Sequence, residues 1–247
     1  MLVREIIPVI GIKVYDEKEL EKLGEHLTLL QRMDAWVQLA SSWRLLEEVG
    51  VGEITDTLID YEVNLASVKL EYSMPFDSAY FEKVAVIADE SKGRTIIVSG
   101  SPDFYKADME KIYEIASIYK VKVLFEPSTP ADYNGIYSLL APFMGGILGL
   151  SIVQEHYPST DSLTSQIRRY LQITKNLEIS NYKDVEPAPL LIPFKYNNPK
   201  LLRFLVRNRF EGFLTVNYER SAVDVRWLVR EFLNLREQLA TLEEKED

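Results

Sequence analysis

Eight short runs rich in aliphatic and β-branched residues recur along this chain, separated by stretches whose apolar residues return every three or four positions. The runs are residues 8–15, 35–39, 65–73, 95–100, 121–127, 146–153, 177–181 and 212–217. Most of them are almost continuously apolar, which is typical of strands covered on both faces. The connecting stretches have the spacing of amphipathic helices, as at Leu23, Leu27 and Leu30. Strands that alternate with helices eight times predict an α/β protein, a single (β/α)₈ TIM barrel.

The chain fits one barrel domain spanning residues 1–247, because no linker rich in Gly, Ser or Pro divides it. The last helix is expected at about 223–243, where Phe232 and several leucines recur at steps of three and four. We expect this face to pack on the barrel; the alternative, that its end pairs with a second copy in a homodimer, stays open. Residues 187–199 contain four prolines and predict a long loop, with a short extra strand at 190–192 as an option.

The composition argues against several classes of function. No run of about 18 apolar residues is present, so we expect no membrane span. The chain has no cysteine, which rules out disulfides, thiolate ligands and cysteine nucleophiles, and favours a cytoplasmic location. A net charge of −10 argues against a broad phosphate-binding surface, and we expect no nucleic-acid partner.

The carboxyl ends of the strands should carry the functional site, because the loops that follow parallel strands gather there. Glu126 is the catalytic candidate, since it ends a β-rich run and is followed at once by Pro127. We interpret it as a ligand-binding group or general base, or otherwise as a carboxylate paired with a lysine such as Lys13, Lys122 or Lys183. Alternation along the strands places other polar side chains toward the same pocket, with an uncertainty of one residue in each strand: Gln38, Glu71, Ser73, Ser99, Asn181, Lys183 and Asn217.

Five segments resemble strand-end motifs of the xylose-isomerase-like TIM barrel superfamily, and they occur in the order of that family. They are residues 34–39, 123–127, 149–156, 179–185 and 210–217. The superfamily contains sugar-phosphate isomerases and epimerases together with metal-dependent apurinic endonucleases. The resemblance implies the barrel fold and a pocket for a small, sugar-like molecule, and it adds His156 to the pocket candidates.

The same resemblance implies a degraded metal site. In the family a divalent metal is held by a carboxylate, an Asp, a His and a Glu from strands five to eight, and it polarises substrate oxygens. The matching positions here are Glu126, Val153, Asn181 and Asn217, of which only the first is anionic. We therefore expect no metal and no other cofactor; the alternative is one divalent metal such as Mn, Mg or Zn held by relocated carboxylates.

The endonuclease branch is not expected, because it needs several histidines around a zinc cluster and this chain contains two. Three functions stay open. The first is a non-catalytic or re-purposed barrel that binds a sugar-like ligand without a metal. The second is a working isomerase or epimerase that uses Glu126 with other carboxylates, for which Glu71, Glu155 and Glu219 are the candidates. The third is a structural or interaction protein that uses loop 187–199 or the last helix.

Overall fold

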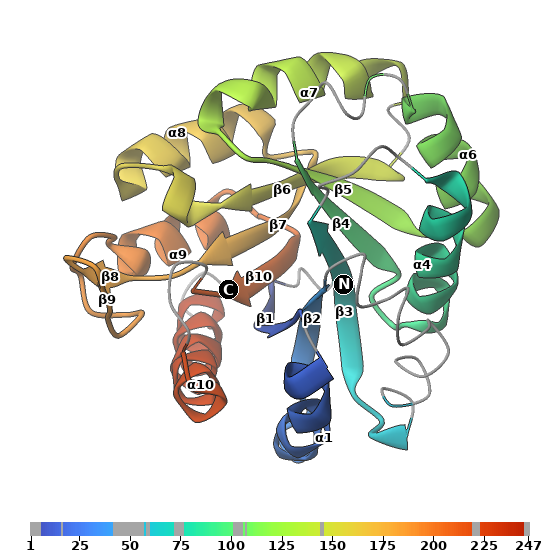
Figure 1. The fold of residues 1–247 in the computed structure, drawn as a ribbon. Helices are drawn as coiled ribbons and strands as arrows, with labels where there is room; N and C mark the ends of the chain where they lie inside the picture. Colours follow the sequence, from blue (N-terminus) through green and yellow to red (C-terminus); the bar gives the residue numbers. More distant parts are fainter. Residues whose placement is uncertain are drawn as a thin grey trace. The chain divides into compact units, whose positions relative to one another are not determined.

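Eight parallel strands among the described residues close into a barrel, which confirms the predicted TIM barrel fold (Figure 1). The computed structural model describes residues 6–15, 17–41, 57, 60–71, 77–100, 106, 108–143, 146–218 and 223–244. The strand order is β1-β10-β7-β6-β5-β4-β3-β2. The strands are β1 (Ile6–Val14), β2 (Trp36–Ser41), β3 (Asn64–Glu71), β4 (Thr95–Gly100), β5 (Lys122–Pro127), β6 (Leu148–Val153), β7 (Thr174–Ile179) and β10 (Gly212–Val216).

Helices follow the strands as the apolar spacing predicts. Within the described residues they are α1 (Glu17–Gln31), α4 (Ser78–Glu90), α6 (Met109–Tyr119), α7 (Tyr133–Leu140), α8 (Thr160–Tyr170), α9 (Asn198–Arg207) and α10 (Val225–Glu243). The helix expected around 43–49 lies outside the described residues. No helix in the described ranges is long and apolar enough to span a bilayer.

The internal contacts of the chain divide it into two compact units. The first unit is Gly11–Ser151, and the second unit combines Met1–Ile10 with Ile152–Asp247. In the first unit, β2 to β6 pair in parallel, and their register aligns Glu71 with Ser99 and Ser99 with Glu126. Helix α4 packs against α6 and begins at Asp77, whose carboxylate accepts from the Ala79 N–H at 2.9 Å. This cap satisfies a helix-end donor that would otherwise lack a partner.

A close backbone approach fixes the connection from α4 to β4. The Gly93 N–H donates to the Leu65 carbonyl at 3.0 Å, and a Cβ on Gly93 would come within 1.9 Å of the Ala66 carbonyl oxygen. Only glycine allows two backbones to lie this close. The turn is thereby held against β3, the strand that carries Lys69.

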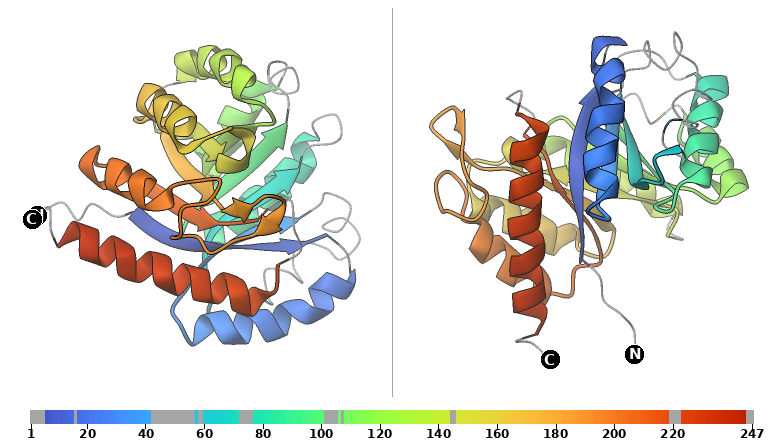
Figure 2. Two further views of the ribbon diagram at one scale, coloured as in Figure 1. Left: turned by 90° about the vertical axis from the view of Figure 1, so that its left-hand side faces the viewer. Right: turned by 90° about the horizontal axis from the view of Figure 1, so that it is seen from below.

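In the second unit, β10 pairs with β1 and β7, and α10 packs against α9 and β10 (Figure 2). Helix α10 starts after Asp224, whose side chain accepts from the Arg226 N–H. Leu228, Phe232 and Leu235 are buried along one stripe, as the heptad-like spacing predicts. The predicted last helix at about 223–243 therefore matches α10 within two residues.

The loop after β7 differs from the expected extra strand at 190–192. A short antiparallel ladder forms earlier, between β8 (Tyr182–Lys183) and β9 (Glu186–Pro187), and residues 190–192 form a turn. The reason is that side chains satisfy the backbone of this turn: Glu231 accepts from the Leu190 N–H at 2.6 Å, and the Asn181 amide donates to the Ile192 carbonyl at 2.6 Å. With these groups bound, a partner strand is not needed.

Candidate functional site

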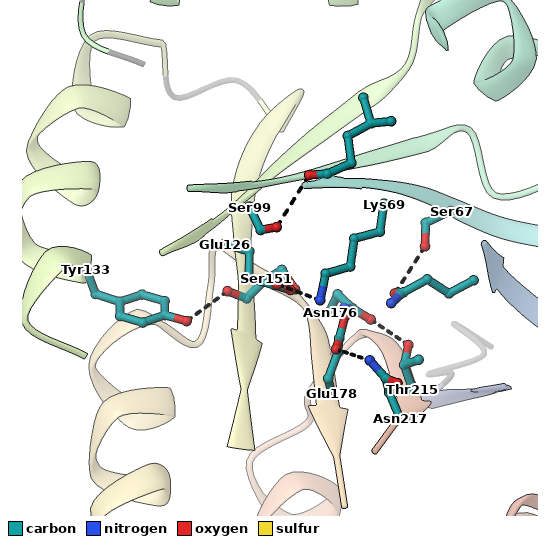
Figure 3. Close-up of polar contacts among 12 residues, drawn as sticks. Ser67, Lys69, Ser99, Glu126, Tyr133, Ser151, Asn176, Glu178, Thr215 and Asn217 are labelled. Atoms are coloured by element: carbon teal, nitrogen blue, oxygen red, sulfur yellow. Dashed lines mark hydrogen bonds and ion pairs between the residues drawn. The ribbon is translucent and has the colours of Figure 1, made fainter. Parts of the chain in front are cut away.

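Lys69, Glu126 and Ser151 form a buried polar cluster in the first unit (Figure 3). The Lys69 Nζ atom lies 2.6 Å from Glu126 Oε1, and the two side chains are 3% and 2% exposed. The Ser151 hydroxyl donates to the other carboxylate oxygen, Oε2, at 2.7 Å. Both oxygens of Glu126 are thus held, one by an ammonium and one by a hydroxyl. We call these three residues the Lys69 cluster.

Strand register explains how three separate strands supply this cluster. Lys69 aligns with Ile97 on β4, and Ile97 aligns with Leu124 on β5, two residues before Glu126. Lys69 therefore lies one level deeper than Glu126 on the same face of the sheet, because side chains alternate along a strand. The long lysine side chain spans the diagonal to the carboxylate across β4. Ser99, which is level with Glu126 on β4, donates to the Leu70 carbonyl instead, at 3.3 Å.

Helix α7 supports the cluster from behind β6. The Tyr133 hydroxyl is buried and donates to the Ser151 carbonyl at 3.1 Å (Figure 3). This contact fixes the backbone of β6 at the residue whose hydroxyl holds Glu126. A buried ion pair loses hydration that its mutual attraction regains only when the geometry is good and further hydrogen bonds are present. The Ser151 hydroxyl and its support by Tyr133 meet that condition.

The residues at the expected metal positions do not fit a divalent cation. The Lys69 ammonium already supplies a positive charge to Glu126. The Asn181 side-chain oxygen accepts from the Tyr182 and Tyr196 N–H groups at 3.0 and 3.1 Å, so its lone pairs point at the backbone. Asn217 turns a donor, its amide Nδ2, toward Glu178 at 2.7 Å. Over the described ranges no three His, Cys, Asp or Glu side chains gather where they could hold a metal ion.

The other predicted pocket residues lie in different settings. Gln38 is buried and accepts from the Ser67 hydroxyl at 3.3 Å, while His156 is half-buried in the short 3₁₀ turn Gln154–His156 after β6. Lys183 is exposed, with its ammonium 6.0 Å from the centre of the Phe194 ring. The structure describes only the backbone of Glu71, and Ser73 lies outside the described residues.

Sequence reasoning missed Lys69 and Ser151. Of the three lysines proposed as partners for Glu126, Lys122 and Lys183 are exposed. A signal for Lys69 was present, because it is the charged residue within the apolar run 65–70, and a lysine in a buried strand requires a partner. Ser151 carries a weaker signal, as a hydroxyl inside the apolar run 146–153.

A second buried polar group lies in the other unit. Thr215 donates to the Asn176 side-chain oxygen at 2.9 Å, next to the contact between Asn217 and Glu178 (Figure 3). All four side chains are buried. The Glu178 carboxylate on β7 therefore orients the Asn217 amide, which lies directly after β10.

Of the carboxylates proposed as relocated metal ligands, the structure describes the side chain of Glu155 but not those of Glu71 and Glu219. Glu155 is buried and accepts from the Tyr182 hydroxyl at 2.6 Å, and the Tyr182 ring packs edge-on against Tyr218. Burial, helped by the Glu231 carboxylate, raises the pKa of Tyr218 far above its ordinary value. Glu219 lies outside the described residues. Glu155 therefore belongs to an aromatic cluster that braces the loop after β7.

Solved structures share this arrangement of strands and helices. A xylose isomerase domain protein from Alicyclobacillus acidocaldarius has a TM-score of 0.66 at 11% identity, covering 96% of this chain and 99% of its own. An uncharacterised protein from Parabacteroides distasonis has a TM-score of 0.66 at 13% identity, covering 95% and 99%. A xylose isomerase-like TIM barrel/4-hydroxyphenylpyruvate dioxygenase fusion protein has a TM-score of 0.61 at 13% identity, covering 98% of this chain and 44% of its own.

The chain shares the TIM barrel fold with these proteins. At these identities the likeness shows the fold alone. No protein-family model matches the sequence, and no curated protein sequence matches it.

Proposed function

We propose that this xylose isomerase-like barrel binds a small polar, sugar-like molecule at the carboxyl ends of its strands without a divalent metal. The observation that carries the proposal is the 2.6 Å contact between the Lys69 ammonium and the Glu126 carboxylate. The Lys69 ammonium then takes the role that a bound metal has in a metal-dependent barrel. It balances the charge of the Glu126 carboxylate and attracts ligand oxygens.

The chemistry of the Lys69 cluster suits hydroxyl and carbonyl oxygens. Lysine offers donors, Glu126 offers acceptors, and Ser151 can act as either, which is the mixture that orients a polyhydroxy molecule. Lys69 and Glu126 lie within the last three residues of β3 and β5. In TIM barrels this end of the strands is where ligands bind. The name of the xylose isomerase domain protein, which shares the fold, agrees with a sugar-like ligand.

The first test is metal content of the purified protein by elemental analysis, together with thermal melts in Mn²⁺, Mg²⁺, Co²⁺ and Zn²⁺. We expect no stoichiometric metal and no change in melting temperature, because Lys69 already balances the charge of Glu126. One equivalent of metal together with a large increase in melting temperature, both lost in Glu126→Gln, would overturn the metal-free proposal. Such an increase follows from mass action whenever a ligand binds only the folded state.

The second test is a ligand screen with free sugars and short hydroxyaldehydes, followed by saturation-transfer NMR. A ligand present at about 100 times its Kd should stabilise the fold by about 2.7 kcal/mol. We expect this stabilisation to disappear in the double variant Lys69→Met/Glu126→Gln, which removes both charges. Lys111→Met is the matched control, because Lys111 is exposed on α6 and pairs with Glu114. Equal stabilisation of the wild type and the double variant would place the ligand elsewhere.

A further inference from the structure

We infer that Lys69 forms an imine with the carbonyl carbon of a small hydroxyaldehyde or hydroxyketone, so that the site is a covalent carbonyl-binding site. This inference rests on the proposed function and deepens it by naming the class of ligand. It starts from the geometry of the Lys69 cluster: a primary amine is buried beside a carboxylate at 2.6 Å, and a hydroxyl holds the far oxygen of that carboxylate at 2.7 Å.

The choice of residue types supports a chemical role over a purely static ion pair. Arginine is the usual cation of a static buried pair, since it is always charged and binds both carboxylate oxygens at once. Here one carboxylate oxygen contacts a lysine and the other is held by Ser151. Lysine in a desolvated setting can release its proton and become a nucleophile, which arginine cannot do. Glu126 is close enough to receive that proton without any movement of the strands.

The reaction balances with the groups present. Glu126 takes one proton from the Lys69 ammonium, and the neutral amine adds to the carbonyl carbon, which forms a C–N bond. Proton transfers that pass through Glu126 then convert the former carbonyl oxygen into water, which leaves as the C–O bond breaks. The product is a protonated imine on Lys69 beside an ionised Glu126. The ion pair with which the reaction began is thus retained, and no oxidant, reductant or metal is needed.

The position of Ser151 fits this sequence of proton transfers. Its hydroxyl donates to Glu126 Oε2, which leaves Oε1 as the oxygen that faces the amine. Tyr133 fixes the Ser151 backbone from α7, so the carboxylate is held while the lysine side chain carries the ligand. A carboxylate held in place transfers protons without the cost of orienting itself at the moment of reaction.

The test is reductive trapping. Glycolaldehyde and dihydroxyacetone are each added to the full-length protein with sodium cyanoborohydride, and the adduct is located by intact mass and peptide mapping. We expect one adduct per chain on Lys69 at low aldehyde concentration, well before exposed lysines such as Lys111 are modified. Lys69→Arg keeps the positive charge but has no amine, so it should lose this adduct, whereas Lys111→Arg should retain it.

A second variant keeps the inference testable if Lys69→Arg does not fold. Glu126→Gln retains the amine and removes the proton acceptor, and the trapping rate at Lys69 should fall by about 100-fold or more. Trapping at an unchanged rate in Glu126→Gln, or labelling of exposed lysines while Lys69 stays unmodified, overturns the inference. If sugars still bind in that case, the proposed function stands and only the covalent step is wrong. If neither binding nor trapping occurs, both are wrong.

Discussion

Replacing Lys69 by methionine removes one partner of the buried pair and leaves the Glu126 carboxylate, 2% exposed, without its ammonium. At 2.6 Å and an effective dielectric constant of about 20, the attraction between the two charges is about 6 kcal/mol. The hydrogen bond from Ser151 remains in the variant and offsets part of that loss. Removing one partner of a buried pair typically costs about 3–5 kcal/mol, and we expect Lys69→Met to fall in this range.

The double variant Lys69→Met/Glu126→Gln should behave differently. Both charges are then absent, and replacing a whole buried pair by neutral groups of similar volume is often neutral or even stabilising. We therefore expect the double variant to be more stable than Lys69→Met, with a coupling energy of about 3 kcal/mol between the two positions. For a chain of this size, Lys69→Met should lower the melting temperature by roughly 6–20 °C.

Urea unfolding followed by far-ultraviolet circular dichroism measures all four corners of the cycle. Lys111→Met serves as the control, since an exposed ion pair contributes about 0–1 kcal/mol. The reasoning is refuted if Lys69→Met stays within about 1 kcal/mol of the wild type, or if the effects of the two single substitutions simply add.

Three further predictions concern the scaffold. Asn181→Ala removes four side-chain hydrogen bonds made within the described residues. At about 0.5–1.5 kcal/mol for each bond, the free energy of unfolding measured in urea should fall by roughly 2–6 kcal/mol, and proteolysis of residues 182–196 should become faster. A fall below about 1 kcal/mol contradicts this prediction. Burial raises the pKa of Tyr218, so above about pH 10 the unfolded chain loses this proton while the folded chain keeps it, and stability falls as the pH rises. Tyr218→Phe should make the decline above pH 10 shallower by about 1.4 kcal/mol per pH unit, and an unchanged slope in pH-dependent unfolding rejects this assignment. Gly93→Ala should lower the melting temperature more than Gly146→Ala does, because a Cβ at position 93 would lie 1.9 Å from a backbone oxygen. A Cβ at position 146 would meet nothing within 4 Å, and the cost there comes only from the φ of +87°. The reverse order of the two melting temperatures contradicts this prediction.

The outline of the fold was predictable because it depends on local patterns. Apolar runs separated by helical spacing require a sheet covered by helices, and eight repeats close such a sheet into a barrel. The extent of α10 was predictable from the leucines and Phe232 that recur at steps of three and four, whereas the cap by Asp224 is seen only in the structure. The turn at 190–192 was not predictable, since its backbone groups are bound by Asn181 and Glu231, and Glu231 is 41 residues away from Leu190.

The order of residues alone places Glu126 near the end of a strand and puts Val153, Asn181 and Asn217 at the other three expected metal positions. The contacts of Glu126 depend on how the strands pair. Lys69 and Ser151 lie one level deeper than the strand ends, and whether their side chains reach Glu126 depends on the register of β3, β4, β5 and β6. Register is set by long-range pairing between strands, and a shift of one residue would turn Lys69 to the opposite face. The sequence therefore identifies Glu126 as the candidate carboxylate, whereas the packing of four strands brings Lys69 to it as the cationic partner.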